Sequence, residues 1–260
     1  MRGLNTKLAV ELTKLLQKQD FQAALMMQDQ TGKTFTFHEQ QVFPSASLIK
    51  LGIAAFIKEE WRTKPDLLGK KLVVNKDQRV AGAGVMHFLH QSEWSLGDVL
   101  ALMLSTSDNT AANLLIDTFG LEQIDSWLAE KDTNIKLQRH FISPVIDGRD
   151  NFLTAEALLP IWQSLLDGND EFSRIVAVAL HEQIDRNKLV YYADDLQFDG
   201  ETYNKTGDLA NVEHDCARLQ RGDAWFDSIV LTKFENSDQH QAAVHLQHDI
   251  GKLLLENLKD

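Results

Sequence analysis

Apolar residues recur along this chain with two different periods. At the N-terminus, through most of the middle and again at the C-terminus they return every three or four positions, which is typical of helices. After about residue 20 and again after about residue 200, apolar and polar residues alternate, which is typical of strands. The predicted helices are residues 4–18, 45–57, 85–90, 95–104, 109–119, 121–130, 155–166, 171–189 and 241–258. The predicted strands are residues 21–28, 34–38, 202–208, 215–220 and 225–234.

The connecting segments carry their own signals. Ser95 and Thr154 stand where helices begin, and their hydroxyls are suited to cap the first turn. Residues 131–153 contain Pro144 and Gly148 and have no clear period, so we expect a long loop. Loops of this length inside compact domains are usually functional.

The order of the elements predicts the fold class. Strands near both ends and a helical block between them indicate an α+β protein. We expect one five-stranded antiparallel sheet flanked by terminal helices, plus an all-helical subdomain. The chain is expected to be a single domain over residues 1–260. Its α/β part would comprise residues 1–58 and 190–260, and its helical subdomain residues 59–189.

Composition limits the classes of partner that we expect the protein to bind. The chain has 260 residues, 43% of them hydrophobic, and its charge is 26 − 38 = −12, which argues against nucleic acid or an anionic membrane as the main partner. No apolar run is long enough to span a bilayer. No secretory signal is visible either, so the sequence as it stands predicts a cytoplasmic protein, although a chain without its leader would look the same. The lone Cys216 excludes an internal disulfide and is expected to be a small buried residue.

The chemistry centres on Ser47 and Lys50, which open the helix expected at 45–57. Three residues apart, their side chains leave the same face near the helix N-terminus. A serine hydroxyl becomes a nucleophile when a neighbouring base takes its proton, and a lysine can do so if it is held neutral. The helix N-terminus favours a developing oxyanion. An S-x-x-K pattern alone is weak, so its meaning depends on partners elsewhere in the chain.

Two further triplets supply complementary groups. In Ser107-Asp108-Asn109, Ser107 is a second hydroxyl that could relay a proton, and Asn109 offers an amide to a substrate. In Lys205-Thr206-Gly207, the lysine suits a substrate carboxylate and could lower the pKa of Lys50. Gly207 would let a substrate lie against the strand, where a backbone N–H could complete an oxyanion hole with that of Ser47.

S-x-x-K, S-D-N and K-T-G in this order are the signature of class A β-lactamases and penicillin-binding proteins, and the chain resembles that family over roughly residues 20–258. The resemblance implies a β-lactamase/transpeptidase-like fold and a covalent acyl-enzyme on Ser47, with Lys50 as proton acceptor. The expected catalytic residues are Ser47, Lys50, Ser107 and Lys205. The expected substrate-binding residues are Asn109, Thr206, Gly207 and Asp208. No cofactor and no metal are implied.

The chain departs from the family at one position. Class A β-lactamases carry a loop glutamate two residues after an arginine, and it activates the water that releases the acyl group. Here Arg139-His140-Phe141 stands at that place, so Phe141 replaces the glutamate. Arg139 and Asp150 resemble the two ends of the loop and are expected to form an ion pair. Lys205-Thr206-Gly207 followed by His214-Asp215 is similar to a subgroup called β-lactamase-like serine hydrolases.

These observations predict a serine hydrolase that forms an acyl-enzyme with β-lactams or a related small amide or ester and releases it slowly. One alternative is a penicillin-binding or sensing domain without turnover. Another is a peptidase or esterase for a non-lactam substrate. Metal-dependent hydrolysis is disfavoured, because His38-Glu39 and His181-Glu182 each lack the second histidine of H-E-x-x-H. The sequence does not name the physiological substrate or the oligomeric state.

Overall fold

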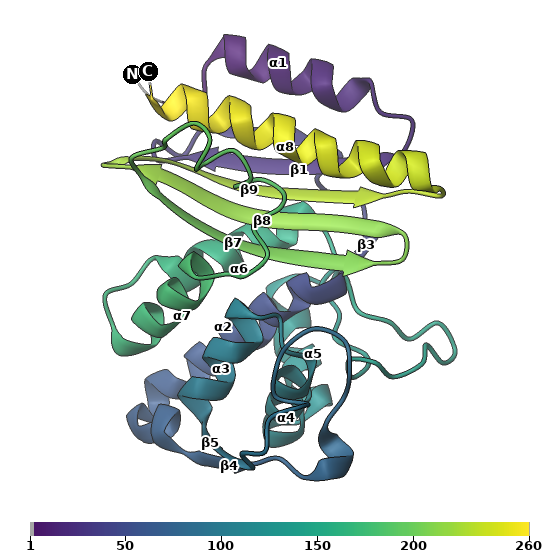
Figure 1. The fold of residues 1–260 in the computed structure, drawn as a ribbon, viewed down its shortest axis with the longest axis vertical. Coiled ribbons are helices and arrows are strands. Elements are labelled where there is room, and N and C mark those ends of the chain that lie inside the picture. The colour runs from purple at the N-terminus through teal and green to yellow at the C-terminus, as the bar shows by residue number, and fades with distance from the viewer. Residues whose placement is uncertain (1–2, 260) are drawn as a thin grey trace. The chain divides into compact units, whose positions relative to one another are not determined.

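The computed structural model describes residues 3–259, which divide into two compact units (Figure 1). One, here called the sheet unit, comprises the chain up to Leu48, Thr154–Leu159 and the chain from Asp185 onward. The other, the helical unit, comprises Ile49–Leu153 and Pro160–Ile184. The expected catalytic residues are distributed over both units, so each unit is described with the site residues it carries.

The sheet unit contains the predicted five-stranded antiparallel sheet. Its strand order is β2-β1-β9-β8-β7, which leaves β2 and β7 at the edges. Neighbouring strands pair antiparallel throughout, and a hairpin joins β1 to β2. The strands are β1 (Gln22–Asp29), β2 (Thr34–Phe37), β7 (Glu201–Leu209), β8 (Val212–Arg221) and β9 (Ala224–Lys233). The prediction of the fold class is confirmed.

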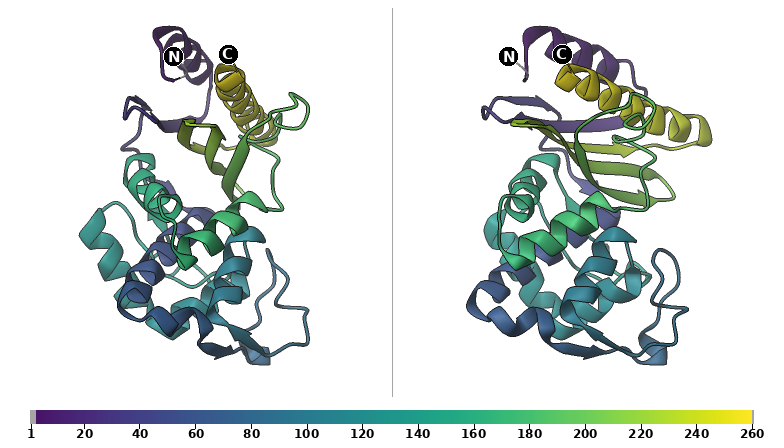
Figure 2. Two further views of the ribbon diagram at one scale, coloured as in Figure 1. Left: turned by 90° about the vertical axis from the view of Figure 1, so that its left-hand side faces the viewer. Right: turned by 60° about the vertical axis from the view of Figure 1, so that its left-hand side comes forward.

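Helices α1 (Thr6–Gln17) and α8 (Ser237–Lys259) lie over one face of this sheet, as Figures 1 and 2 show. The side chain of Asn5 caps α1 by accepting a hydrogen bond from the Leu8 backbone N–H at 2.9 Å. The apolar stripes of both helices and the inward-facing residues of the strands form a single core cluster. Its members include Leu8, Leu12, Leu16, Leu25, Met27, Phe226, Leu246, Ile250 and Leu254.

The helical unit is built around α2 (Ile49–Thr63), which is buried along ten consecutive residues. Phe56 on α2 meets the rings of Phe119 and Trp127 edge-on, each at 5.7 Å between centroids. The other helices wholly within this unit are α3 (Leu96–Ser105), α4 (Asn109–Phe119), α5 (Leu121–Lys131) and α7 (Glu171–His181). The helix α6 (Ala155–Leu166) belongs partly to each unit. Short elements missed in the sequence are β4 (Lys71–Val73), β5 (Glu93–Ser95), β6 (Phe152–Leu153), and the 3₁₀ turns η2 (Pro65–Gly69) and η3 (Lys76–Gln78).

Two predicted helix caps are present. The Ser95 hydroxyl accepts a hydrogen bond from the Asp98 backbone N–H at 3.1 Å at the start of α3. The Thr154 hydroxyl accepts one from the Ala157 N–H at 3.1 Å at the start of α6. These caps satisfy backbone donors that have no partner within the first helical turn, and they explain why both helices begin where the sequence indicated.

The helix predicted at residues 85–90 is wrong, because this segment forms turns. Only one hydrogen bond joins two of its backbone groups, from the Phe88 N–H to the Val85 carbonyl at 3.3 Å, and others bind side chains. Asp108 accepts hydrogen bonds from the backbone N–H groups of Val85 (2.6 Å) and Met86 (2.7 Å). The Arg79 guanidinium donates to the carbonyl of Met86 and to that of Leu89 at 2.6 Å. These contacts occupy backbone groups that a helix would pair with one another, and they hold the segment in turns.

The helix predicted at residues 171–189 is only partly correct, since α7 ends at His181 and residues 182–200 form turns. Within the helical unit, the Ile184 N–H donates to the Ser105 carbonyl at 3.1 Å. Within the sheet unit, the Leu189 N–H donates to the Asp215 carboxylate at 3.0 Å. Each contact draws the backbone away from a helical path, and neither partner is close in sequence.

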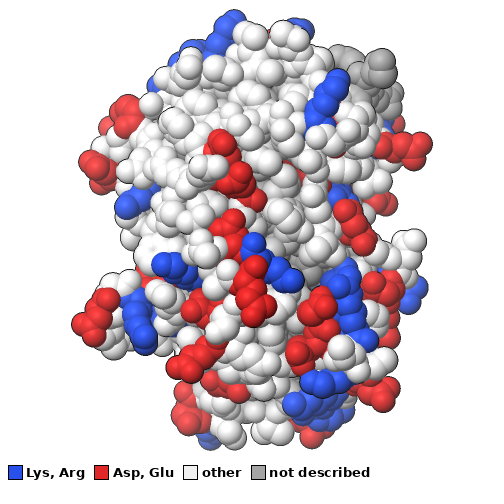
Figure 3. Space-filling model, turned by 180° about the vertical axis from the view of Figure 1, so that it is seen from behind, with Lys and Arg blue, Asp and Glu red and all other residues white. Residues whose placement is uncertain are grey.

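No helix among residues 3–259 is both long enough and apolar enough to cross a membrane. On the face seen in Figure 3, Lys and Arg side chains stand among Asp and Glu side chains.

Cys216 is buried and unpaired, as predicted, and burial raises the pKa of its thiol.

Candidate active site

Ser47 lies in the sheet unit, in a 3₁₀ turn (Ala46–Leu48) between β3 (Phe43–Pro44) and the first residue of α2. The residue before it, Ala46, has a φ of 47°, in the left-handed region that non-glycine residues seldom adopt. Backbone strain of this kind costs about 1–3 kcal/mol and persists where the surrounding structure enforces it, often at functional sites. Ser47 is partly exposed, while Ser45 and Leu48 beside it are buried.

Lys50, in the first turn of α2, is fully buried. It belongs to the helical unit, as does the Ser107 triplet. Its Nζ donates to the Ser107 carbonyl at 2.5 Å, the Ser107 hydroxyl at 3.2 Å and the Asn109 amide oxygen at 2.8 Å. The carbonyl and the amide oxygen can only accept, so Lys50 donates to both, whereas a hydroxyl such as that of Ser107 can donate to an amine or accept from it. Ser107 itself has a φ of 53° and is partly exposed. The arrangement provides a route for a proton between Lys50 and the Ser107 hydroxyl.

Phe141 lies against the same lysine. Lys50 Nζ is 4.3 Å from the centroid of the Phe141 ring, within the range of a cation–π contact. The side chain of Asn113, on α4, holds the Phe141 backbone at both ends. It accepts from the Phe141 N–H at 2.8 Å and donates to its carbonyl at 3.1 Å. Position 141 is therefore firmly placed next to Lys50, and the group it presents there cannot accept a proton.

The loop that carries Phe141 is closed by the predicted ion pair. Arg139 Nε lies 2.5 Å from Asp150 Oδ1, and the two side chains are 19% and 18% exposed. Asn151 adds to this closure by accepting hydrogen bonds from the Gln138 and Arg139 backbone N–H groups. His140, next to Phe141, has its Nε2 at 2.9 Å from Asp117 Oδ1. Its ring is therefore engaged by a carboxylate on α4.

The K-T-G triplet lies on β7, an edge strand of the sheet unit. A side chain at Gly207 would be tightly packed, since a Cβ there would lie 3.2 Å from the backbone nitrogens of both Ser47 and Leu48. This close approach sets the strand beside the backbone of Ser47, as the predicted oxyanion hole requires. Thr206 directs its hydroxyl to Asp185 at 3.2 Å.

Lys205 is fully buried and donates to the Thr206 carbonyl at 2.8 Å. Burial lowers the pKa of Lys205 to about 8, and the carboxylates of Asp208, Asp215 and Asp185 offset part of that effect. The amine thus carries its positive charge at neutral pH and loses it in mildly alkaline solution.

Asp208, predicted to bind substrate, is paired in the structure with Lys188, a residue that sequence reasoning missed. Lys188 also lies 2.6 Å from Glu213. Nothing in the sequence pointed to Lys188, because it falls in the stretch 171–189, whose apolar pattern predicted a helix.

His214 and Asp215 lie behind the strand and are fully buried. The His214 Nδ1 accepts a hydrogen bond from the Thr232 N–H at 3.1 Å, so its Nε2 donates to the Pro44 carbonyl at 2.8 Å. Burial lowers the pKa of His214 to about 4 and raises that of Asp215 to about 7. The neutral histidine therefore ties β8 to the segment that leads into Ser47.

Each unit thus gathers its own share of the predicted residues. The helical unit brings together Lys50, Ser107, Asn109 and Phe141, and the sheet unit brings Gly207 beside Ser47. The sequence did not predict that Asn113 would bind the backbone of Phe141, although Asn113 stands in the helix that follows S-D-N. Among residues 3–259, no group of three or more His, Cys, Asp or Glu side chains is placed to hold a metal ion.

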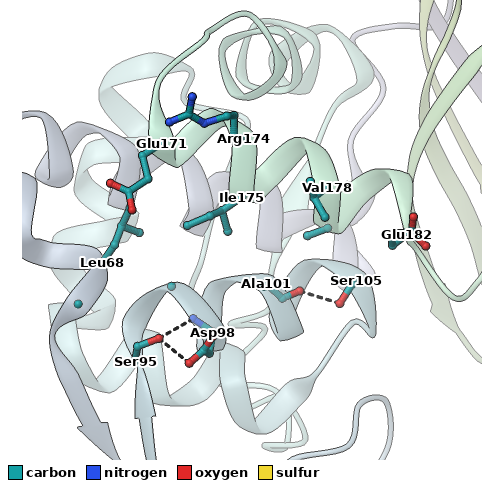
Figure 4. Close-up of a pocket in the computed structure, with 13 residues that line it drawn as sticks. Leu68, Ser95, Asp98, Ala101, Ser105, Glu171, Arg174, Ile175, Val178 and Glu182 are labelled. Atoms are coloured by element: carbon teal, nitrogen blue, oxygen red, sulfur yellow. Dashed lines mark hydrogen bonds between the residues drawn. The ribbon is translucent and has the colours of Figure 1, made fainter.

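A separate hollow of about 600 Å³ lies in the helical unit between α3 and α7 (Figure 4). Its walls are largely apolar, with Ala101, Ile175 and Val178 facing it. The two serines that line it are engaged, because Ser95 donates to Asp98 and Ser105 donates to the Ala101 carbonyl. None of the residues of the S-x-x-K, S-D-N and K-T-G motifs lines the hollow, so it is not the candidate active site.

Comparison with known proteins gives the class. A family model described as the β-lactamase enzyme family matches residues 7–258, so the chain belongs to that family, and it is a β-lactamase-type serine hydrolase. Among solved structures, a β-lactamase from Sphaerobacter thermophilus is 22% identical, with a TM-score of 0.85 and 98% of each chain covered. A class A β-lactamase from Mycobacterium abscessus is 18% identical, with a TM-score of 0.82, covering 97% of this chain and 100% of that one.

PBP-A is similar to the same degree, with 19% identity, a TM-score of 0.81, and coverage of 98% of this chain and 96% of that one. A variant of PBP-A has been solved as an acyl-enzyme complex with penicillin G. At these identities the likeness to solved structures concerns the fold. A search of curated proteins found no match.

Proposed function

We propose that the protein forms a covalent acyl-enzyme on Ser47 with β-lactams or a related small amide or ester, and that it releases the acyl group slowly. The observation that carries this proposal is the Lys50 amine, buried among the Ser107 hydroxyl, the Asn109 amide and the Phe141 ring. This arrangement supplies a base and a proton relay for acylation, whereas the Phe141 ring cannot act as a base for hydrolysis of the acyl-enzyme.

In acylation, the Ser47 oxygen attacks the carbonyl carbon of the substrate while its proton passes to Lys50. The C–N or C–O bond of the substrate then breaks, and the proton returns through the Ser107 hydroxyl to the departing nitrogen or oxygen. The backbone N–H of Ser47, beside the strand that carries Gly207, is suited to stabilise the oxyanion of the tetrahedral intermediate. The product is a Ser47 ester. A β-lactam keeps the new amine attached to the acyl group, because its ring opens, whereas an open-chain amide or ester releases an amine or an alcohol.

Deacylation requires a water molecule whose proton is taken as it attacks that ester. Phe141 stands where the family's loop glutamate would do this, and a phenyl ring accepts no proton. His140, the nearest titratable group along the loop, is engaged by Asp117. A missing general base costs about 10²–10⁴-fold in the step it serves. We therefore expect slow release, and Phe141 at this position supports a place for the chain in the subgroup without the loop glutamate.

A second candidate is a penicillin-binding or sensing protein that is acylated and does not turn over. PBP-A, whose variant was captured with penicillin G, has a similar fold and motivates this alternative. The two candidates share the acylation step and differ only in how long the acyl group remains.

A time course of intact-protein mass with penicillin G tests both. We expect near-stoichiometric addition of one penicilloyl group, followed by its loss at a rate that is slow yet measurable. An adduct that persists indefinitely would favour the sensing protein. Absence of any adduct, with a folded protein and with esters as well as β-lactams, would contradict the proposed function.

A further inference from the structure

The sheet unit has a hollow of about 460 Å³ where α1 ends and β1 begins. Its walls combine amide side chains with aromatic rings, and they include Gln17, Gln19, Gln22, Gln41, Phe21 and Phe37. None of the described residues that line it is Asp, Glu, Lys or Arg, although 25% of the chain's residues are charged. None belongs to the three catalytic motifs either. We call this place the glutamine hollow.

The pairing of the strands explains why the glutamine hollow exists. β1 begins at Gln22, but its pairing with β2 begins only at Leu25, opposite Phe37, the last residue of β2. The chain then turns away at His38, whose φ of 48° is left-handed. A hydrogen bond from the Gln41 N–H to the His38 carbonyl, at 2.9 Å, closes this turn. β1 therefore extends past the end of β2, and the hollow occupies the place beside it.

The amides around the glutamine hollow have donors and acceptors to spare. Gln41 Nε2 donates to Gln22 Oε1 at 2.9 Å, which holds the two side chains together. This pairing leaves the Gln22 amide nitrogen and the Gln41 amide oxygen without a partner among residues 3–259. Gln19 Nε2 donates to the Leu15 carbonyl at 2.8 Å, so its amide oxygen can accept from a ligand. A sugar hydroxyl both donates and accepts, and neutral amides that do the same are matched to it.

The aromatic rings supply the apolar part of the walls. Phe21 and Phe37 are half-buried and pack against the core cluster of the sheet unit. The His38 ring extends the surface of Phe37, with 4.1 Å between ring centroids and 35° between ring planes. A pyranose has an apolar C–H face and a rim of hydroxyls, so flat rings beside amides match both of its parts.

We propose that the glutamine hollow binds a neutral saccharide of one or two pyranose units. Its volume is within the range of about 300–1,000 Å³ that is usual for small-molecule sites. A charged ligand finds no opposite charge on these walls. An extended peptide would need open backbone on β1, whereas Ala23, which lines the hollow next to Gln22, is only 3% exposed. The site would serve recognition and would be separate from the acylation of Ser47.

NMR titration of the isotope-labelled protein tests the proposal. The probes are cellobiose, maltose and diacetylchitobiose. Sorbitol is the first control, because it carries hydroxyls but has no ring, and a capped trialanine peptide is the second. We expect at least one disaccharide to shift the side-chain amide signals of Gln22 and Gln41 and to receive saturation transfer at its C–H protons. Both controls should do neither.

Variants assign the binding to the glutamine hollow. Gln41→Ala removes one amide and its bond to Gln22, at a half-exposed position where folding should be unaffected. Phe37→Leu keeps most of the apolar volume and removes the flat ring. Each should weaken the binding of the disaccharide by roughly fivefold or more, as expected for lost hydrogen bonds or a lost ring contact. Gln241→Ala, at an exposed glutamine on α8 that does not line the hollow, is the matched control and should bind as the wild type does.

Three results would overturn the inference: no binding of any disaccharide, equal binding of sorbitol or the peptide, or equal dissociation constants for the Gln41→Ala and Gln241→Ala proteins. Ser47→Ala should bind the same disaccharide as tightly as the wild type, and loss of binding in that variant would place the saccharide at the active site instead. None of these results bears on whether Ser47 is acylated, so the two proposals stand or fall separately.

Discussion

Replacing Phe141 by glutamate tests the account of slow release. The two hydrogen bonds from Asn113 involve only the backbone at position 141, so a new side chain there should keep the same placement. A glutamate would then put its carboxylate into the space of a ring whose centroid is 4.3 Å from Lys50 Nζ. The lost cation–π contact is worth about 0.5–2 kcal/mol and is replaced by a charge pair. A general base typically contributes about 10²–10⁴-fold, so deacylation should accelerate by that factor.

The assay follows the decay of the penicilloyl adduct by intact-protein mass after excess penicillin G has been removed. Phe141→Gln is the matched control, because glutamine has nearly the same shape and polarity and cannot take a proton from water. We expect the glutamine variant to release the acyl group at close to the wild-type rate. Equal acceleration in both variants would mean that the phenyl ring only blocks water. No acceleration in either would mean that release is limited elsewhere.

Three further outcomes follow from the same geometry. Asp150→Asn should lower the free energy of unfolding by about 1–3 kcal/mol in denaturant titrations, because it leaves the half-buried Arg139 unpaired; Glu59→Gln, which breaks an exposed pair, should change little. Asn113→Ala should cost a similar amount, since it strips the partners from both backbone groups of residue 141, and unchanged stability would contradict the role of this contact. Burial lowers the pKa of Lys205 to about 8, so acylation by a carboxylate-bearing β-lactam should decline as pH rises through about 8, relative to a neutral ester; parallel pH profiles would show that Lys205 does not bind the carboxylate.

Local signals accounted for much of the architecture. The helix at 109–119 was predicted with its observed bounds because Asp108 caps its start and Gly120, with a φ of 92°, ends it. The sheet followed from the alternating pattern of its strands. The Arg139–Asp150 pair was found because the motif resemblance identified both ends of the loop.

The errors arose where distant side chains satisfy the backbone. Residues 85–90 have an apolar pattern suited to a helix, and nothing nearby indicates that Asp108 and Arg79 bind their backbone groups instead. The Lys188 contacts with Asp208 and Glu213 were missed for the same reason, since Lys188 stands 20 and 25 residues before its two partners. Such contacts depend on the folded chain, and a single sequence carries no local mark of them.

The proposed function depends on Ser47 being the acylated residue. The most direct measurement is mass-spectrometric mapping of a fluorophosphonate adduct, because this probe carries no carboxylate and needs no deacylation step. We predict one phosphonyl group on Ser47 in the wild-type protein and in Ser45→Ala, a control that removes the buried neighbouring hydroxyl, and none in Ser47→Ala. Equal labelling of Ser47→Ala, or a modified residue other than Ser47, would contradict the account.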